Sequence, residues 1–80
     1  MKVKTMSGST YIISEENGKI FLDKKVSEIQ EESINGSVRY ELKYTPTPVL
    51  GEKMKCVLVR ESILYGNYIL TSPIVEIFIP

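Results

Sequence analysis

The amino-acid sequence predicts an all-β fold, a small antiparallel barrel or sandwich of five to seven short strands with little or no helix. The first observation behind this prediction is composition: 22 of the 80 residues are the β-branched Ile, Val or Thr, and none is Ala. Such side chains suit a pleated surface, whereas Ala favours helices. The second observation is the pair of Asn-Gly dipeptides, Asn17-Gly18 and Asn35-Gly36, which are strong hairpin signals.

The length and the missing residue types limit the classes of function. Eighty residues make one domain, spanning 1–80. The absence of His excludes an ordinary Ser-His-Asp triad and a His-ligated metal, and a single Cys excludes an internal disulfide or a zinc-binding Cys cluster. That residue, Cys56, lies in an apolar run, so we expect a buried, inert thiol. We therefore predict a protein that is not an enzyme and holds no metal or cofactor.

The first β region covers 2–14, and two arrangements fit it. Val3, Tyr11 and Ile13 share parity, so one long strand bent at Ser7-Gly8 explains the pattern, and two short strands are the alternative. A glycine inside a strand pattern often marks a bulge. We interpret this Gly-containing segment as a bulge rather than as a hydroxyl-rich nest for a ligand.

The two Asn-Gly pairs predict two hairpins. Asn17-Gly18 joins 11–14 to a strand at 19–25, because Asn and Gly tolerate the positive φ that a type I′ turn needs at both central positions. Asn35-Gly36 precedes a strand at 37–45, in which apolar and polar residues alternate.

Segment 26–34 admits two interpretations. A two-residue turn after it would place Ile29 opposite Leu42 and Glu32 opposite Arg39, with apolar pairs on one face and opposite charges on the other. The alternative is a short capped helix. We favour a strand or an irregular segment, because the apolar residues are too few for an amphipathic helix.

Two further strands follow an irregular, proline-containing connection at 45–51. Segment 55–61 is apolar on both faces at its centre, which is typical of a central strand covered on both sides. Gly66-Asn67 predicts a primed turn that leads into a strand at 68–71.

The last strand is predicted at 74–79, after a break at Ser72-Pro73. It contains one charge, Glu76, and would invite aggregation if it lay on an open edge. It should therefore be a central strand or pair across a subunit interface. Because the chain also lacks a disulfide or metal to stabilise a small core, we predict a homo-oligomer.

Six residues are candidates for ligand binding. Arg39 and Arg60 could bind an anion through their planar guanidinium groups, although we favour a salt bridge for Arg39 and, for Arg60, a side chain that extends along a partly apolar strand face. Tyr65 and Tyr68 flank the predicted turn, where we favour a cross-strand pair that closes the hairpin over stacking on a ligand or a protein contact. Thr71-Ser72 adds hydroxyl groups at a strand bend.

Two short sequence segments resemble the N-terminal and C-terminal parts of small uncharacterised all-β proteins encoded by bacteriophages. They are Ser7-Gly8-Ser9-Thr10-Tyr11 and Leu70-Thr71-Ser72-Pro73-Ile74-Val75-Glu76. The resemblance implies a role in inhibiting host defence, because small phage proteins without catalytic residues often bind a defence protein or form oligomers that sequester nucleotide signals.

These observations predict a non-enzymatic, homo-oligomeric binding protein that sequesters a small anionic ligand, such as a nucleotide signal, at a subunit interface. The alternative is an interaction module that inhibits a host protein by direct docking. Ten Lys and Arg residues balance ten Asp and Glu residues, so we do not expect nucleic-acid binding. The sequence has no secretory signal, and its most apolar stretch, 69–79, is about half the length of a membrane-spanning helix, so we expect a cytoplasmic protein without membrane contact.

Overall fold

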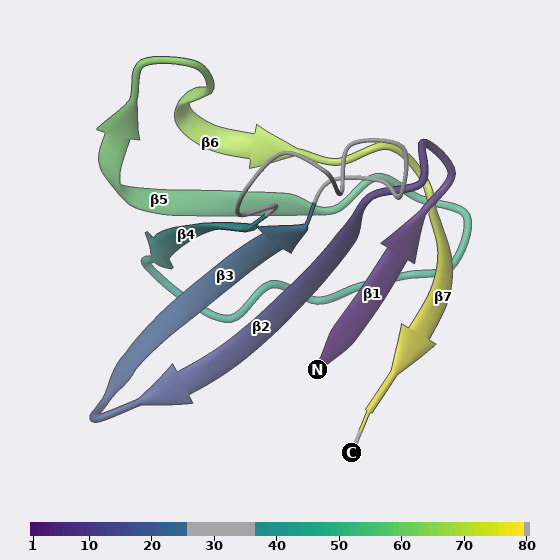
Figure 1. Ribbon diagram of the computed structural model, residues 1–80, viewed down its shortest axis with the longest axis horizontal. Helices are drawn as coiled ribbons and strands as arrows, with labels where there is room; N and C mark the ends of the chain where they lie inside the picture. Colours follow the sequence, from purple (N-terminus) through teal and green to yellow (C-terminus); the bar gives the residue numbers. More distant parts are fainter. Residues whose placement is uncertain (26–36, 80) are drawn as a thin grey trace.

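The structure is a computed structural model that describes residues 1–25 and 37–79 (Figure 1). These residues form seven strands and no helix, and every strand pairing is antiparallel. The all-β prediction is therefore confirmed. The strands are β1 (Lys2–Thr5), β2 (Thr10–Glu16), β3 (Lys19–Lys25), β4 (Ser37–Leu42), β5 (Lys55–Ser62), β6 (Gly66–Leu70) and β7 (Ile74–Phe78).

The strands form one sheet in the order β6-β5-β4-β3-β2-β1-β7, which curls into a half-barrel (Figure 1). Its two edge strands, β6 and β7, are consecutive in the chain and are joined by a short connection at the upper right of the figure. The loop before β5 lies beside this connection. Leu50 forms a bridge with Ile74, and the N–H of Thr71 donates to the carbonyl oxygen of Met54 at 3.0 Å.

Alternate residues of the strands build the core on one face of the curled sheet. Leu22, on the middle strand β3, is completely buried and lies between Ile13 of β2 and Tyr40 of β4 in the register. This alternation is why the period-two pattern of the sequence succeeded as a guide to the strands. The buried apolar residues are Val3, Tyr11, Ile13, Leu22, Leu42, Met54, Cys56, Leu58, Ile69 and Ile74.

The hairpin predicted at Asn17-Gly18 is confirmed. Glu16 pairs with Lys19, which leaves a two-residue turn. The φ angles of Asn17 and Gly18 are 53° and 80°, both positive as the type I′ turn requires. The strand after this turn, Lys19–Lys25, has the predicted bounds.

Of the two arrangements that fit 2–14, the structure has the two short strands, and the single bent strand is wrong. The chain reverses between β1 and β2, which pair antiparallel with Val3 opposite Tyr11. Gly8 has a φ of 95° in this turn, and its N–H donates to the carbonyl oxygen of Thr5 at 3.0 Å. Shared parity could not separate the two arrangements, because a bend and a hairpin both keep these residues on one face.

The turn predicted at Gly66-Asn67 lies three residues earlier. Ser62 pairs with Gly66, so the turn consists of 63–65. The Ser62 hydroxyl accepts hydrogen bonds from the N–H groups of Leu64 and Tyr65, both at 3.2 Å. Gly66 has a φ of 79°, so its conformational freedom is used where the turn ends and β6 begins.

Two expectations about burial are corrected. On β5, Cys56 and Leu58 are buried, but Val59 is 43% exposed, so the strand is not covered on both faces. β7 is not central: it lies at the edge of the sheet, and within the described residues its only neighbouring strand is β1. Its pairing across a subunit interface stays a prediction. The irregular connection at 45–51 is confirmed, with one bridge at Leu50.

The predictions made for 26–36 lie outside the described residues. They are the Asn35-Gly36 turn, the choice between a strand and a short helix, and the cross-strand pairs that depend on them. The strand after this segment, Ser37–Leu42, ends three residues before the predicted limit.

Candidate functional site

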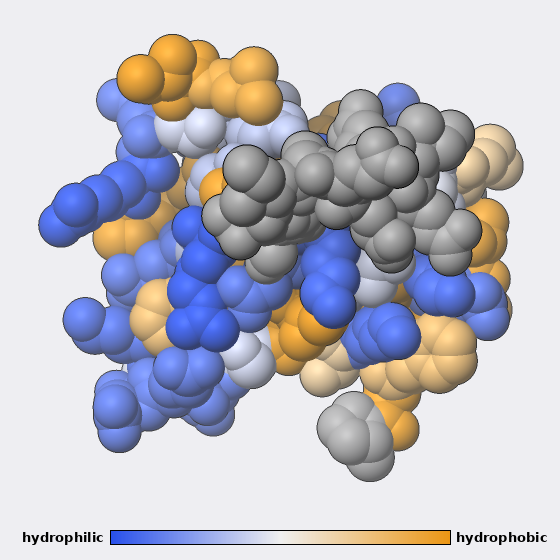
Figure 2. Space-filling view, viewed as in Figure 1, coloured by the Kyte–Doolittle hydropathy of each residue, from blue (hydrophilic) through white to orange (hydrophobic). Residues whose placement is uncertain are grey.

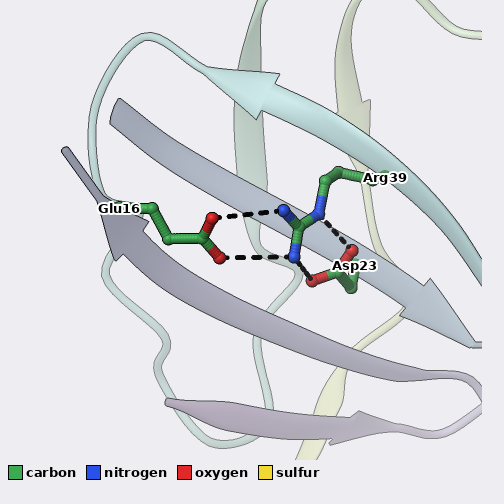
Figure 3. Close-up of polar contacts among 3 residues, drawn as sticks. All are labelled: Glu16, Asp23 and Arg39. Atoms are coloured by element: carbon green, nitrogen blue, oxygen red, sulfur yellow. Dashed lines mark hydrogen bonds and ion pairs between the residues drawn. The ribbon is translucent and has the colours of Figure 1, made fainter. Parts of the chain in front are cut away.

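Arg39 is held by two carboxylates on the outer face of the sheet (Figure 3). Asp23 stands opposite it on β3 and accepts hydrogen bonds from Nε and Nη2 at 2.8 and 3.0 Å. Glu16 lies 3.5 Å from the guanidinium, whose carbon is 4.8 Å from the centre of the Phe21 ring. The hydrogen bonds to Asp23 raise the pKa of Arg39. The salt-bridge interpretation is therefore confirmed, with partners other than Glu32, which lies outside the described residues.

Arg60 and Arg39 line the same shallow hollow between β4 and β5. The two strands pair at one register position, Leu42 with Leu58, and the hollow of about 230 Å³ lies where they separate. Two glutamates, Glu41 and Glu61, share its wall with the arginines, so its charge is mixed. The lining residues are Arg39, Tyr40, Glu41, Leu58, Arg60, Glu61 and Ser62.

Tyr65 belongs to an aromatic cluster around Lys24. The Lys24 ammonium donates a hydrogen bond of 2.8 Å to the Tyr65 hydroxyl and lies 5.8 Å from the centre of the Tyr11 ring. Tyr40 packs edge-on against Tyr65, with ring centres 6.0 Å apart. Burial lowers the pKa of Lys24, but the hydrogen bond to Tyr65 and the nearby tyrosines outweigh it, so the net shift is upward. Burial raises the pKa of Tyr11.

Tyr68 lies apart from Tyr65. It stands opposite Val57 on the neighbouring strand, is 44% exposed, and has the Lys55 ammonium 4.6 Å from its ring centre. The predicted Tyr65–Tyr68 cross-strand pair is therefore wrong, because the turn comes earlier than expected: Tyr65 lies in the turn itself, and Tyr68 lies on β6.

Thr71 and Ser72 are engaged in hydrogen bonds that hold the fold together. The Thr71 hydroxyl accepts from the Met54 N–H at 2.9 Å and donates to the Ser72 carbonyl oxygen at 2.7 Å. The Ser72 hydroxyl donates to the Ser7 hydroxyl at 3.0 Å and accepts from the Ser7 N–H at 3.2 Å. These contacts attach the β6–β7 connection to the loop before β5, through Thr71, and to the β1–β2 turn, through Ser72.

Cys56 is buried, as the sequence predicted. Burial raises the pKa of its thiol to about 12. The reactive thiolate form is therefore scarce near neutral pH.

Large apolar side chains are exposed at both edges of the sheet, and this feature was only partly visible in the sequence. Figure 2 shows hydrophobic patches at the β5–β6 turn and along β7. We call them the β6 surface and the β7 surface. The β6 surface consists of Val59, Ile63, Leu64, Tyr68 and Leu70, and the β7 surface of Val75, Phe78 and Ile79.

The most exposed residues of the β6 surface were not among the candidate residues predicted from the sequence. Ile63 is fully exposed and Leu64 is 77% exposed at the tip of the β5–β6 turn. Two large aliphatic residues between Ser62 and Gly66 could have signalled this tip, had the turn been placed there. Beside β7, a hollow of about 300 Å³ is lined by Met1, Lys2, Ile12, Phe78 and Ile79.

The six predicted ligand-binding residues thus do not form one site. Arg39 and Arg60 meet at the mixed-charge hollow, and the other four lie elsewhere. Comparison of the chain with protein-family models, with curated proteins and with solved structures gave no match. In the described part of the chain, no helix is long and apolar enough to cross a membrane.

Proposed function

We propose that this chain is a non-enzymatic binding protein that acts as a homo-oligomer and docks on a partner protein through exposed apolar side chains at its sheet edges. The observation that supports this proposal best is the nature of the edges. Natural edge strands usually carry charges, prolines or covering segments, whereas β6 and β7 carry large apolar side chains that water reaches.

The β6 surface is the proposed docking site for the partner protein. Ile63 and Leu64 project from a turn whose backbone is held by the Ser62 hydroxyl. Aliphatic side chains in such a position add nothing to the core of this chain, and burying them against another protein removes apolar area from water. Exposed Tyr68, on the adjoining strand, adds the aromatic type that is enriched at interface centres.

A partner-capture experiment tests this docking site. The double variant Ile63→Ser/Leu64→Ser should weaken partner binding by about tenfold or more, since central apolar contacts typically cost over 1 kcal/mol each. The exposed loop residue Lys53 supplies the control, Lys53→Ser, which should bind as the unmodified chain does. Equal binding by both variants would remove the β6 surface from the proposal.

Sequestration of a small anionic ligand is the second candidate, and the hollow that holds Arg39 and Arg60 is the observation in its favour. Arg39 already faces two carboxylates, and Glu41 and Glu61 repel an anion there, so we place this function after protein docking. Calorimetric titration with nucleotides and cyclic dinucleotides tests it. Binding that Arg60→Ala abolishes would raise this candidate to first place.

The resemblance to phage proteins adds a biological version of the proposal, in which the partner belongs to host defence. Expression of the chain in a defended bacterium should then restore phage growth, and Ile63→Ser/Leu64→Ser should abolish the rescue. Unchanged phage growth across several defence systems would count against this version and leave docking itself standing.

A further inference from the structure

We propose that two copies of the chain pair antiparallel through the outer edge of β7, about a two-fold axis at Ile77, so that two half-barrels share one continuous sheet. This inference rests on the homo-oligomeric part of the proposed function. It adds the strand, the register and the residues that meet.

The hydrogen bonds that β1 makes with β2 determine which way the N–H and carbonyl groups of β7 point, because β1 lies between these two strands. Met1 and Ile13 exchange two hydrogen bonds, of 3.0 and 2.8 Å. Because bonding direction alternates along an antiparallel strand, Val3 also faces β2, and Lys2 and Lys4 face β7. Their partners Phe78 and Glu76 consequently bond to β1.

Ile77 therefore turns its N–H and carbonyl groups away from β1, toward the outer edge. Within the described residues, no strand pairs with that edge. Past the register shift at Val75, the edge has little of the usual protection, because β7 has one charged residue, Glu76, which lies 4.0 Å from Lys4 of the same sheet. A second copy can satisfy these backbone groups.

A loop of the chain marks where the open edge begins. The outer N–H of Ile74 donates to the carbonyl oxygen of Glu52 at 3.0 Å, and its carbonyl accepts from the Gly51 N–H at 2.8 Å. The edge available to a second copy therefore starts after Ile74. Val75, which has no partner on β1 because the register shifts there, is its first residue, and 76–79 form its regular part.

Charge and overlap select the register. An axis at Ile77 pairs Ile77 with itself, Val75 with Ile79, and Glu76 with Phe78, which uses the whole of 75–79. An axis at Glu76 would set like charges opposite each other, which is unfavourable, and would place the second strand against the loop that covers Ile74. An axis at Phe78 would pair Phe78 with itself, so the Glu76 of the second copy would no longer lie beside the Phe78 ring and the Lys2 ammonium.

The side chains agree with the axis at Ile77. Val75 and Ile79, which would face each other across the axis, are 48% and 76% exposed in the single chain. Phe78 lies beneath the Lys2 ammonium at 5.4 Å, and the Glu76 of the second copy would lie directly beside this ring. The pairing thus covers the β7 surface and places an acidic group near a basic one.

Disulfide trapping between two different single-cysteine variants tests the register. Chains with Glu76→Cys are mixed with chains with Phe78→Cys and oxidised. In the proposed dimer, residue 76 of one copy and residue 78 of the other form a non-hydrogen-bonded pair. The Cα atoms of such a pair are about 4.5 Å apart, within disulfide reach. The mixed dimer should exceed either same-variant dimer severalfold, and Lys19→Cys in the β2–β3 turn should form none. The native Cys56 is buried and stays reduced.

Each other outcome overturns a defined part of the proposal. Dominant Phe78→Cys or Glu76→Cys same-variant dimers would move the axis and refute the register. An oligomer by native mass spectrometry without any trapped dimer would refute β7 pairing and leave homo-oligomerisation intact. A monomer at micromolar concentration would refute both.

A backbone variant gives an independent measurement. Ile77→Pro removes the outward N–H at the axis without removing a bond to β1, so it should convert the dimer to a monomer. Ile77→Val keeps the N–H and should keep the dimer. Circular dichroism reports whether the monomeric variant is folded, and a folded Ile77→Pro dimer would contradict the proposal.

Discussion

At the scale of single residues, the side chains best suited to chemistry are already occupied within the fold. The Arg39 guanidinium faces Asp23 and Glu16, and the Lys24 ammonium bonds to the Tyr65 hydroxyl. Of the two arginines that suggested an anion site, Arg39 therefore holds neighbouring strands together. This arrangement supports recognition by exposed apolar surface more than recognition by charge.

Cys56 leads to a prediction about alkaline pH. Burial raises the pKa of its thiol from 9.0 to about 12, so the folded chain keeps a proton that the unfolded chain releases. The resulting stabilisation is fully present below pH 9 and is lost as the pH rises toward 12. The free energy of unfolding should fall by about 1.4 kcal/mol per pH unit in this window from this group.

Urea unfolding of the native chain and of Cys56→Val at several alkaline pH values measures this slope. Val has a similar volume and does not titrate, so the variant should lose stability less steeply. The upward pKa shifts of Tyr40 and Lys24 are shared by both chains and cancel in the difference. The upward shift of Tyr11 cancels except for its smallest contribution, which comes from Cys56 itself. Parallel pH profiles would contradict the role assigned to the thiol.

At the scale of elements, tight turns determine which strands pair. The β2–β3 turn depends on positive φ at Gly18, where a side chain would meet no atom within 4 Å. Replacement by Ala therefore tests backbone strain alone, and Gly18→Ala should destabilise the chain by about 1–2 kcal/mol. Gly18→Asn should cost less, because Asn tolerates this conformation. Thermal unfolding gives both values, and a Gly18→Ala variant as stable as the native chain would show that strain at this position is negligible.

Elements specified by local signals could be predicted from the sequence. The Asn17-Gly18 turn and the strand after it needed only neighbouring residues, and both are confirmed. The β5–β6 turn was misplaced because the Ser62 hydroxyl holds the turn, a side-chain contribution that the Gly66-Asn67 pattern does not contain. The position of β7 at an edge of the sheet could not be predicted from the sequence either, because an apolar run suits a buried strand and an interface strand equally.

At the scale of the whole molecule, the curl of the sheet decides where the candidate residues go. Tyr65 and Tyr68 are close in the chain but have different neighbours, whereas Ser7 and Ser72 are 65 positions apart and share hydrogen bonds. Strand order brings such residues together, and no periodicity in the sequence specifies it. The sequence could therefore predict that each candidate residue lies in or near a strand, but not which candidate residues come together in a site.

The half-barrel is held at the connection between its two edge strands, and Thr71 is the central residue there. Its buried hydroxyl is the acceptor for the Met54 N–H at 2.9 Å. Thr71→Val keeps the shape but removes that acceptor, leaving a buried donor unsatisfied at a cost of about 1–3 kcal/mol. Thr71→Ser keeps the hydroxyl, so it should retain the hydrogen bond and lose only the packing of one methyl group.

Hydrogen exchange shows whether this hydrogen bond holds the two edges together or acts only locally. In Thr71→Val the amide of Met54 should exchange faster, and so should those of Gly51 and Ile74, which join the loop to β7. Faster exchange at all three positions means that the connection opens as one unit, since loss of the Thr71 contact frees the loop from both edge strands. If Met54 alone were affected, the curl would instead depend on the core beneath the sheet. Unchanged exchange and stability would exclude Thr71 from any role in closing the half-barrel.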